Sequence, residues 1–194
     1  MEHMDGLSVE GCEQCGDLVA SRSRIVDGVG PADAELLFVG EAPGEREDEQ
    51  GEPFVGRSGT VLDDALRDAG LSRADVRITN CVRCRPPENR DPTSDERSNC
   101  RPYLDREIDQ VDPTVIVTLG KVPGEHLLDR DLAVTSEAGS IEDVDIEGTT
   151  RRVLICVHPA ATLYDRSQRE TFERTIQQAA DLAGDGGQAE LGDF

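Results

Sequence analysis

Four short apolar runs, separated by stretches with helical periodicity, constrain the fold of this 194-residue chain more than any other feature. The runs span residues 34–40, 76–80, 114–120 and 153–157. Each is almost continuously apolar, which is typical of strands buried on both faces of a sheet. Helical patterns cover residues 58–69, 94–111, 124–129 and 166–183, and the acidic segment 135–150 reads as a hairpin or surface excursion. This alternation predicts an α/β fold with a parallel sheet and helices on both of its faces.

The chain is strongly acidic, with 41 Asp and Glu against 20 Lys and Arg and a net charge of −21. A single lysine, Lys121, is among the basic residues, and Trp is absent. Such acidity argues against a simple cationic nucleic-acid binder. An acidic, nearly lysine-free and folded chain favours a salt-rich cytoplasm, where screening relieves self-repulsion. An ordinary acidic protein is the alternative.

The sequence offers no membrane span and no secretion signal. No run approaches the ~18 apolar residues that a transmembrane helix needs, and the first residues, MEHMDGLSVEG, lack a basic region followed by an apolar one. We therefore expect a cytoplasmic protein.

Six cysteines stand at positions 12, 15, 81, 84, 100 and 156. Without a secretion signal, a disulfide framework is not expected. Cys12 and Cys15 form one CxxC pair and Cys81 and Cys84 form another, a spacing typical of metal or cluster ligation. The two pairs alone indicate zinc, but Cys100 adds a fifth candidate ligand, so the spacing leaves the metal open.

Distinctive side chains follow the predicted strands at the edge where parallel sheets bind ligands. We expect a pocket that collects Glu41, Phe54, Asn80 and His158. An aromatic ring stacks on planar groups, a carboxamide pairs with an amide-like edge, and an imidazole donates to an oxygen that gains negative charge. Together these side chains suit a nucleobase. For any one of them taken alone a structural role is favoured, such as capping of a strand end by Asn80 or His158. No GxxxxGK[ST] or GxGxxG motif is present, so nucleotide hydrolysis and dinucleotide chemistry are poorly supported.

Arginines are concentrated in residues 77–106, which hold seven of them against five acids. The local balance is 7 − 5 = +2, in a chain whose net charge is −21. Beside a pocket of the size of a base, such a segment predicts contact with a phosphate backbone. Ion pairing along a helix face is the alternative.

Several stretches resemble the family 4 uracil-DNA glycosylases, the iron–sulfur members of their superfamily. They are GEAPGEREDEQGEPFVGRSG (40–59), ITNCVRCRPPENRDP (78–92), HPA (158–160) and the cysteine spacing 12, 15, 84, 100. The resemblance extends from residue 12 to residue 180 and, with the acidity, indicates a haloarchaeal source. It implies a three-layer α/β/α sandwich around a four-stranded parallel sheet. It also implies hydrolysis of the bond that joins uracil to deoxyribose in DNA, the first step of base excision repair.

The resemblance also assigns the cysteines and a DNA-binding loop. The residues that match the ligands of a 4Fe-4S cluster are Cys12, Cys15, Cys84 and Cys100. Cys81 and Cys156 are then expected to be packed thiols, and zinc is the alternative metal. The cluster would fix an arginine-rich loop, from which Arg83, Arg85 and Arg90 are expected to contact the DNA backbone.

Within the pocket, the resemblance implies that Phe54 stacks on the flipped uracil and that Asn80 reads its polar edge, which rejects cytosine. His158 would stabilise the charge on O2 of the departing uracil. Glu47 would help to exclude thymine, whose methyl group needs room.

The mechanism is limited by Ala42, which stands where better-known relatives carry a water-activating Asp. Backbone groups at Glu41 and Ala42 are expected to line the pocket near uracil O2, and Glu41 and Asn89 to orient water. Without a general base, we expect a dissociative reaction that depends on stabilising the leaving anion. No lysine matches a Schiff-base position, so we expect a monofunctional enzyme that first flips the base. A non-catalytic uracil-binding module and a glycosylase of wider specificity are the alternatives.

The chain is predicted to form one glycosylase domain over residues 1–183 and a glycine-rich tail over 184–194. Gln188, Leu191 and Phe194 form a QxxLxxF pattern, which resembles the peptide with which repair proteins bind the sliding clamp. A chance match is the alternative, because short motifs match often. We expect a nucleoid-associated monomer that acts on uracil-containing DNA.

Overall fold

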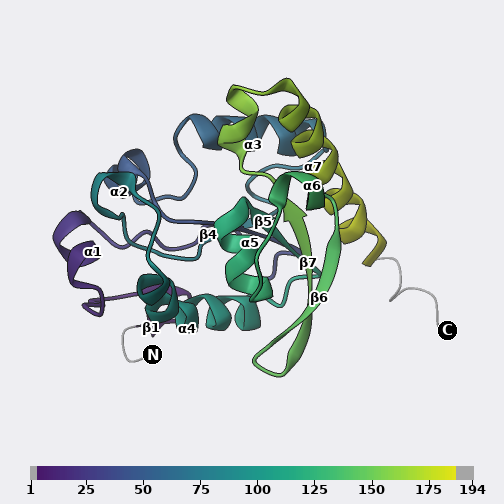
Figure 1. Cartoon of the computed structure of the whole chain (residues 1–194). Helices are drawn as coiled ribbons and strands as arrows, with labels where there is room; N and C mark the ends of the chain where they lie inside the picture. The colour runs from purple at the N-terminus through teal and green to yellow at the C-terminus, as the bar shows by residue number, and fades with distance from the viewer. Residues whose placement is uncertain (1–3, 187–194) are drawn as a thin grey trace.

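The computed structural model describes residues 4–186, and a five-stranded mixed sheet lies at the centre of that part of the chain (Figure 1). The strands are β3 (Leu36–Gly40), β4 (Arg77–Asn80), β5 (Val115–Leu119), β6 (Ile141–Ile146) and β7 (Thr149–Cys156). Their order in the sheet is β4-β3-β5-β7-β6. The first four in this order are parallel, which confirms the predicted α/β class.

The edge strand β6 corrects the expectation of a sheet with four strands, all parallel. It pairs antiparallel with β7, and the two form a hairpin in the acidic segment. Side chains of β6 alternate between more and less exposed positions, so this strand lacks the continuous apolar run of a central one. The strand β7 begins at Thr149, before the apolar run that starts at residue 153. Its first half is mostly exposed and polar, because it pairs with the edge strand β6.

Helices cover both faces of the sheet, as predicted. The longer ones are α3 (Arg57–Asp68), α4 (Ser94–Val111), α5 (Lys121–Leu128) and α7 (Arg166–Gly186). Leu62 of α3 and Phe172 of α7 pack with Phe38 on one face. Leu104 of α4 and Leu127 of α5 belong to the cluster on the other face, and Figure 1 shows this three-layer arrangement.

The ends of three helices can be compared with the sequence signals. Thr93 caps α4 through a capping box with Glu96, in which each side chain accepts from the other residue's backbone N–H. The helix α5 starts three residues earlier than predicted, with Pro123 in its first turn, where a missing N–H costs nothing. The helix α7 reaches Gly186, three residues past the predicted end of the domain.

Several short elements escaped the sequence analysis because they are too brief to show a period. They are β1 (Met4–Asp5), β2 (Ser8–Val9), α1 (Gly16–Ser21), α2 (Glu45–Gln50), η1 (Pro87–Asn89), α6 (Val134–Glu137) and η2 (Pro159–Leu163). Within residues 4–186, no helix is long and apolar enough to cross a membrane.

The register of the parallel strands brings their carboxyl ends to one edge. Gly40 of β3 pairs with Asn80 of β4, and Leu119 of β5 pairs with Cys156 of β7. The chain leaves β3 toward α2 and leaves β7 toward η2 at this edge. Loops from distant parts of the sequence therefore meet there.

Candidate active site

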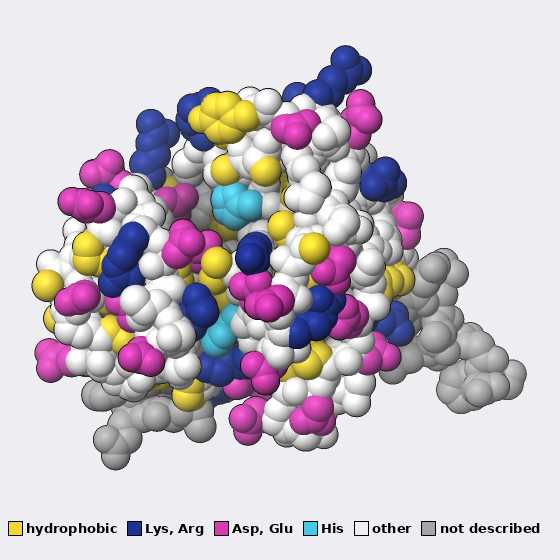
Figure 2. All heavy atoms as spheres, viewed as in Figure 1, with side chains coloured by type: hydrophobic (Ala, Val, Ile, Leu, Met, Phe, Trp, Pro, Cys, Tyr) yellow, Lys and Arg dark blue, Asp and Glu magenta, His cyan; other side chains and the backbone are white. Residues whose placement is uncertain are grey.

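A cavity of about 190 Å³ opens where the loops after β3, β4 and β7 meet. Its lining residues are Glu41, Ala42, Gly44, Glu47, Phe54, Ser58, Asn80 and His158. The structure thus brings together all the pocket residues expected from the sequence except Asn89. Figure 2 shows the hollow on this face of the molecule, with a histidine side chain in it.

Phe54 and Asn80 meet at Gly40, the last residue of β3. A Cβ atom on Gly40 would stand 2.5 Å from Cζ of Phe54 and 2.4 Å from Oδ1 of Asn80, so only glycine leaves room for both. Asn80 and Phe54 are both buried, with exposed fractions of 3% and 6%. The ring of Phe54 also faces that of His158, with centroids 6.0 Å apart and an angle of 34° between the planes. An aromatic face and a carboxamide therefore border one space.

His158 is held by the backbone of η2. The N–H of Ala160 donates to Nδ1 of His158 over 3.1 Å. Burial lowers the pKa of His158, and the charge of Glu47 opposes this only in part. The imidazole is therefore neutral at neutral pH. Because Nδ1 accepts a hydrogen bond, the ring proton sits on Nε2, which makes that nitrogen a donor.

Glu47, on α2, closes another side of the cavity. Its Oε1 accepts the backbone N–H of Gly56 over 3.3 Å, which links α2 to the start of α3. The next residue, Asp48, is 2% exposed, and both of its carboxylate oxygens accept from the N–H of Ser23 at 2.9 Å. Asp48 thereby ties the cavity wall to the amino-terminal segment. Sequence reasoning missed Asp48 and Ser58, although both lie within the motif 40–59.

Glu41 carries an unusual carboxyl group. Burial, followed by the charge of Asp91 and a hydrogen bond with it, raises the pKa of Glu41 to about 7, while Arg97 opposes the shift. Glu41 therefore remains partly protonated near neutral pH. Asp91 was not expected in this role, and its place in the motif 78–92 was the only signal for it.

Asn89 does not reach the cavity. It lies in η1 with a left-handed backbone, φ 55°, and its Oδ1 accepts from Nε of Arg85 over 2.7 Å. Asn89 is absent from the cavity lining. This corrects the expectation that its carboxamide orients water beside the substrate.

Four cysteines belong to two small clusters, one of which also includes Ala42 of the cavity lining. Cys15, Cys84 and Cys100 pack around Val82 together with Ala42, and Cys12 lies beside Cys100. Ala42 therefore belongs both to the cavity lining and to the cluster that contains these thiols. By contrast, Cys81 and Cys156 are buried at 1% and 0% exposure in the apolar clusters of the two sheet faces. This matches the expectation of packed thiols.

Two of the four cysteines accept hydrogen bonds of the kind that metal-binding thiolates receive. Nη1 of Arg22 donates to Sγ of Cys84 over 2.9 Å, and Nη2 donates to the carbonyl of Cys12 over 2.6 Å. Nδ2 of Asn99 donates to Sγ of Cys15 over 3.4 Å. Donors aimed at sulfur stabilise thiolates, the form that binds metals. Among the described residues, no three His, Cys, Asp or Glu side chains converge closely enough for one metal ion.

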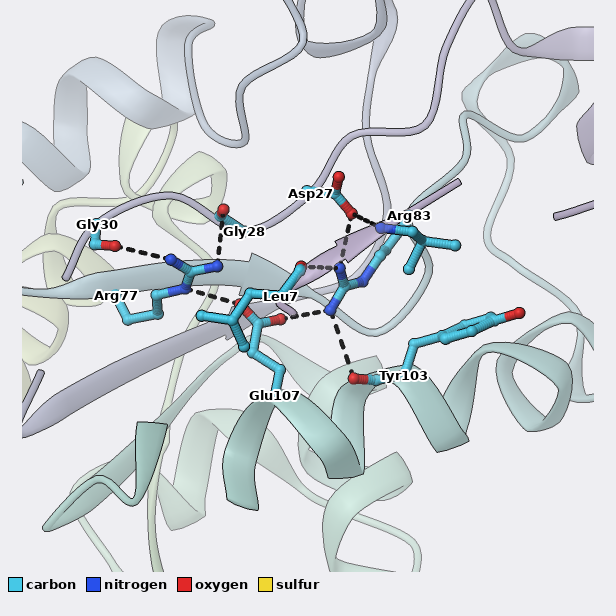
Figure 3. A network of polar contacts seen from close by, with 9 residues as sticks. Leu7, Asp27, Gly28, Gly30, Arg77, Arg83, Tyr103 and Glu107 are labelled. Atoms are coloured by element: carbon cyan, nitrogen blue, oxygen red, sulfur yellow. Dashed lines mark hydrogen bonds and ion pairs between the residues drawn. The ribbon is translucent and has the colours of Figure 1, made fainter. Parts of the chain in front are cut away.

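Arg83 is not available to DNA, contrary to expectation. Its side chain is 2% exposed and bonds Oε2 of Glu107 and Oδ1 of Asp27, each over 2.7 Å (Figure 3). Arg77, which is also buried, donates to the other oxygen of Glu107 over 2.8 Å. A buried guanidinium must find carboxylates, and Glu107 supplies one for both arginines.

Ion pairs neutralise more of the arginines of residues 77–106 than these two. Besides Arg77 and Arg83, Arg101 pairs with Asp105 at 2.6 Å. Arg90 makes two bonds to Glu96, at 2.8 and 2.7 Å. Arg85 is 22% exposed and has its nearest carboxylate, Glu45, at 3.6 Å. Ion pairing explains most of the charge that sequence analysis attributed to a phosphate-binding surface. The predicted clamp-binding residues Gln188, Leu191 and Phe194 lie outside the described residues.

Residues 28–180 match the uracil DNA glycosylase superfamily. The chain is 40% identical over 190 residues to a type-4 uracil-DNA glycosylase of Archaeoglobus fulgidus, covering 95% of each chain. It is 40% identical over 177 residues to the type-4 uracil-DNA glycosylase of Sulfurisphaera tokodaii, covering 89% of this chain and 80% of the relative. It is also 40% identical over 160 residues to that of Thermotoga maritima, covering 82% and 81%.

Proposed function

The chain belongs to the uracil DNA glycosylase superfamily and removes uracil from DNA, and we propose that it does so as a monofunctional hydrolase in the cavity described above. The observation that carries this assignment of the site is the meeting of Phe54, Asn80 and a neutral His158 around one space. Uracil must leave the base stack to reach such a cavity.

Recognition of uracil rests on Phe54 and Asn80. The ring of Phe54 offers a stacking face. Oδ1 of Asn80 accepts from N3–H of uracil and Nδ2 donates to O4, a pairing that cytosine reverses. Both side chains are fixed against Gly40, so their positions do not adapt to another base. Glu47, which borders the same cavity, limits the room for a methyl group on the pyrimidine.

His158 acts on the leaving group. The bond between C1′ of the sugar and N1 of uracil breaks, and its electron pair stays with uracil, where O2 shares the negative charge. Nε2–H of neutral His158 donates to this oxygen without giving up its proton. Such a donor stabilises the transition state more than the ground state, since the charge on O2 grows as the bond breaks.

Water adds to the sugar cation after the bond breaks, and the Glu41 carboxylate on the cavity lining takes its proton. Ala42 carries no carboxylate, whereas Glu41 lies beside it on the lining. With a pKa of about 7, Glu41 is partly ionised at neutral pH. The products are uracil and an abasic site. No Schiff base is involved.

Cys12, Cys15, Cys84 and Cys100 would hold a 4Fe-4S cluster. The relatives carry the type-4 name, and the four thiols with their sulfur-directed donors from Arg22 and Asn99 support this choice. When bound, the cluster cross-links the amino-terminal segment to the loop before α4 and to α4 itself. Iron, sulfide and zinc analysis of purified protein, together with its visible absorption, tests the proposal. A colourless protein with stoichiometric zinc would refute it.

The arginines expected to contact the DNA backbone are those whose side chains are partly exposed. Arg85 is the better candidate, because its ion pair with Glu45, at 3.6 Å, is longer than the 2.7 Å pair of Arg90 with Glu96. Arg90 is 34% exposed and already neutralised by Glu96. Few phosphate contacts suit a chain of net charge −21 in a salt-rich, haloarchaeal cytoplasm, because salt weakens each contact. The tail residues Gln188, Leu191 and Phe194 are proposed to bind a sliding clamp, which deletion of residues 188–194 in a clamp-binding assay would test.

The decisive experiment is a glycosylase assay in molar salt. Oligonucleotides containing one uracil, one hypoxanthine or a thymine mispair are incubated with the protein, and abasic products are cleaved by alkali. We expect product from uracil only. Product from hypoxanthine would indicate wider specificity, and binding of uracil-containing DNA without product would indicate a non-catalytic module.

A further inference from the structure

The backbone of Phe54 is in an uncommon conformation for a bulky residue. Its φ is 56°, in the left-handed region that aromatic side chains rarely adopt. Such strain persists only where surrounding contacts enforce it, and it is concentrated at functional sites. The strain here lies at the residue whose ring forms the aromatic wall of the cavity.

Arg73, in the loop between α3 and β4, supplies those contacts. Its Nη1 donates to the carbonyl of Pro53 over 3.1 Å, and Nη2 donates to the carbonyl of Phe54. Nε of the same guanidinium donates to Oδ1 of Asp63 on α3 over 2.6 Å. One rigid, planar group therefore binds the two carbonyls that flank the Cα atom of Phe54, and it is itself oriented by Asp63 of α3.

The first turn of α3 contacts the Phe54 carbonyl from another side. A Cβ atom on Gly59 would stand 1.6 Å from the Phe54 carbonyl oxygen, so glycine is required for this approach. The Phe54 carbonyl is thus pressed between α3 and the Arg73 guanidinium. This arrangement leaves the ring pointing toward Gly40 and His158.

We propose that Arg73 is a positioning residue that holds Phe54 in its left-handed conformation and so fixes the stacking face of the uracil pocket. The inference rests on the proposed function, since it takes Phe54 to stack on uracil. A guanidinium is suited to this task because its fixed fork meets two carbonyls at once. A lysine at position 73 offers one donor group and reaches one carbonyl at a time.

A double-mutant cycle separates positioning from general stability. The variants are Arg73→Met, Phe54→Ala and the two combined, with Arg67→Met as control. Arg67 lies on the same helix as Asp63, is 70% exposed and pairs with Asp64 at 2.8 Å. The readouts are kcat and KM for an oligonucleotide with one deoxyuridine, and Kd for free uracil by NMR titration below the melting temperature of every variant.

We expect Arg73→Met to raise KM and the Kd for free uracil about 10-fold, within the range of base–aromatic stacking. Arg67→Met should change neither. If Arg73 acts only through Phe54, the double variant should bind uracil as Phe54→Ala does, with no further loss. Should Arg73→Met fail to fold, Arg73→Lys and Asp63→Asn are expected to give smaller losses in the same direction.

Two results would overturn the inference while leaving the proposed function intact. One is that folded Arg73→Met binds free uracil with an unchanged Kd, while Phe54→Ala binds it more weakly. The other is that adding Arg73→Met to Phe54→Ala raises the Kd for uracil as much as Arg73→Met does alone. If Phe54→Ala itself binds uracil normally, the proposed stacking role fails and the inference falls with it.

Discussion

The N–H of Ala160 donates to Nδ1 of His158 over 3.1 Å, so the single proton of the neutral ring is on Nε2. Two residues of one 3-10 turn thereby decide which nitrogen can donate to the substrate. Burial keeps the ring neutral by lowering its pKa. The donor is consequently ready before uracil enters, and no reorganisation is needed as charge develops.

Substitution of His158 by Ala should therefore reduce kcat about 10²–10³-fold, the usual cost of losing one donor to a developing anion. KM should change less, because the charge on O2 is small in the ground state. Steady-state kinetics on a single-deoxyuridine oligonucleotide measure both. His126→Gln, which alters another histidine outside the cavity lining, is the control, and a loss in KM alone would contradict the assigned role.

The pH dependence should report on Glu41. Its pKa of about 7 predicts that kcat/KM rises as pH passes through 7 and levels off above it, because the ionised form accepts the proton of water. Asp91→Asn should move the rise to lower pH, since it removes the neighbouring negative charge. Glu41→Gln should abolish the rise. An unshifted profile in Asp91→Asn would show that the pair does not control the titration.

The same carboxyl predicts a stability effect of definite sign. The folded state holds the Glu41 proton more tightly than the unfolded chain does, so its ionisation destabilises the fold as pH rises from about 4.5 to 7. Glu41→Gln should therefore melt at a higher temperature than wild type at pH 8, and the difference should shrink toward pH 5. Thermal melts at constant salt check this expectation, and a difference that grows at low pH would contradict it.

The buried network around Glu107 should be costly to break. Its carboxylate is 0% exposed and bonds both Arg77 and Arg83, so Glu107→Gln leaves buried positive charge without its partner. We expect a loss of about 3–5 kcal/mol in the free energy of unfolding, measured by denaturant titration in molar salt. Glu170→Gln, in an exposed pair with Arg166 at 3.5 Å, should cost less than about 1 kcal/mol. Equal losses would argue against the network.

Arg22 should control how firmly the metal group is held. Arg22→Gln removes the donor to Cys84 and should weaken metal binding about 10–100-fold, the usual cost of losing an outer-shell partner, so that a chelator removes the metal faster. Arg24→Gln is a matched control, because it removes the same charge two residues away from an exposed side chain. Release is followed by metal analysis and visible absorption. Identical rates in both variants would rule out this role.

Local sequence was sufficient for the sheet strands β3, β4, β5 and β7, for α4 and for the pocket residues Phe54, Asn80 and His158. Apolar runs and helical periods are properties of neighbouring residues, and carboxyl ends of parallel strands converge by topology. The edge strand β6 was expected only as part of a hairpin or excursion, because a half-exposed strand lacks a continuous apolar run.

The sequence by itself determined that this chain builds a base-sized pocket from three strand ends and carries two CxxC pairs beside an arginine-rich segment. Only the tertiary structure decided which charged side chains remain exposed for contact with DNA. Arg83 and Arg85 are two residues apart, yet Arg83 is buried by Glu107 and Asp27, which lie 24 and 56 residues away. Likewise, Arg73 reaches the Phe54 carbonyl across 19 residues. A side chain's charge is local, but its desolvation and its partners depend on the whole fold.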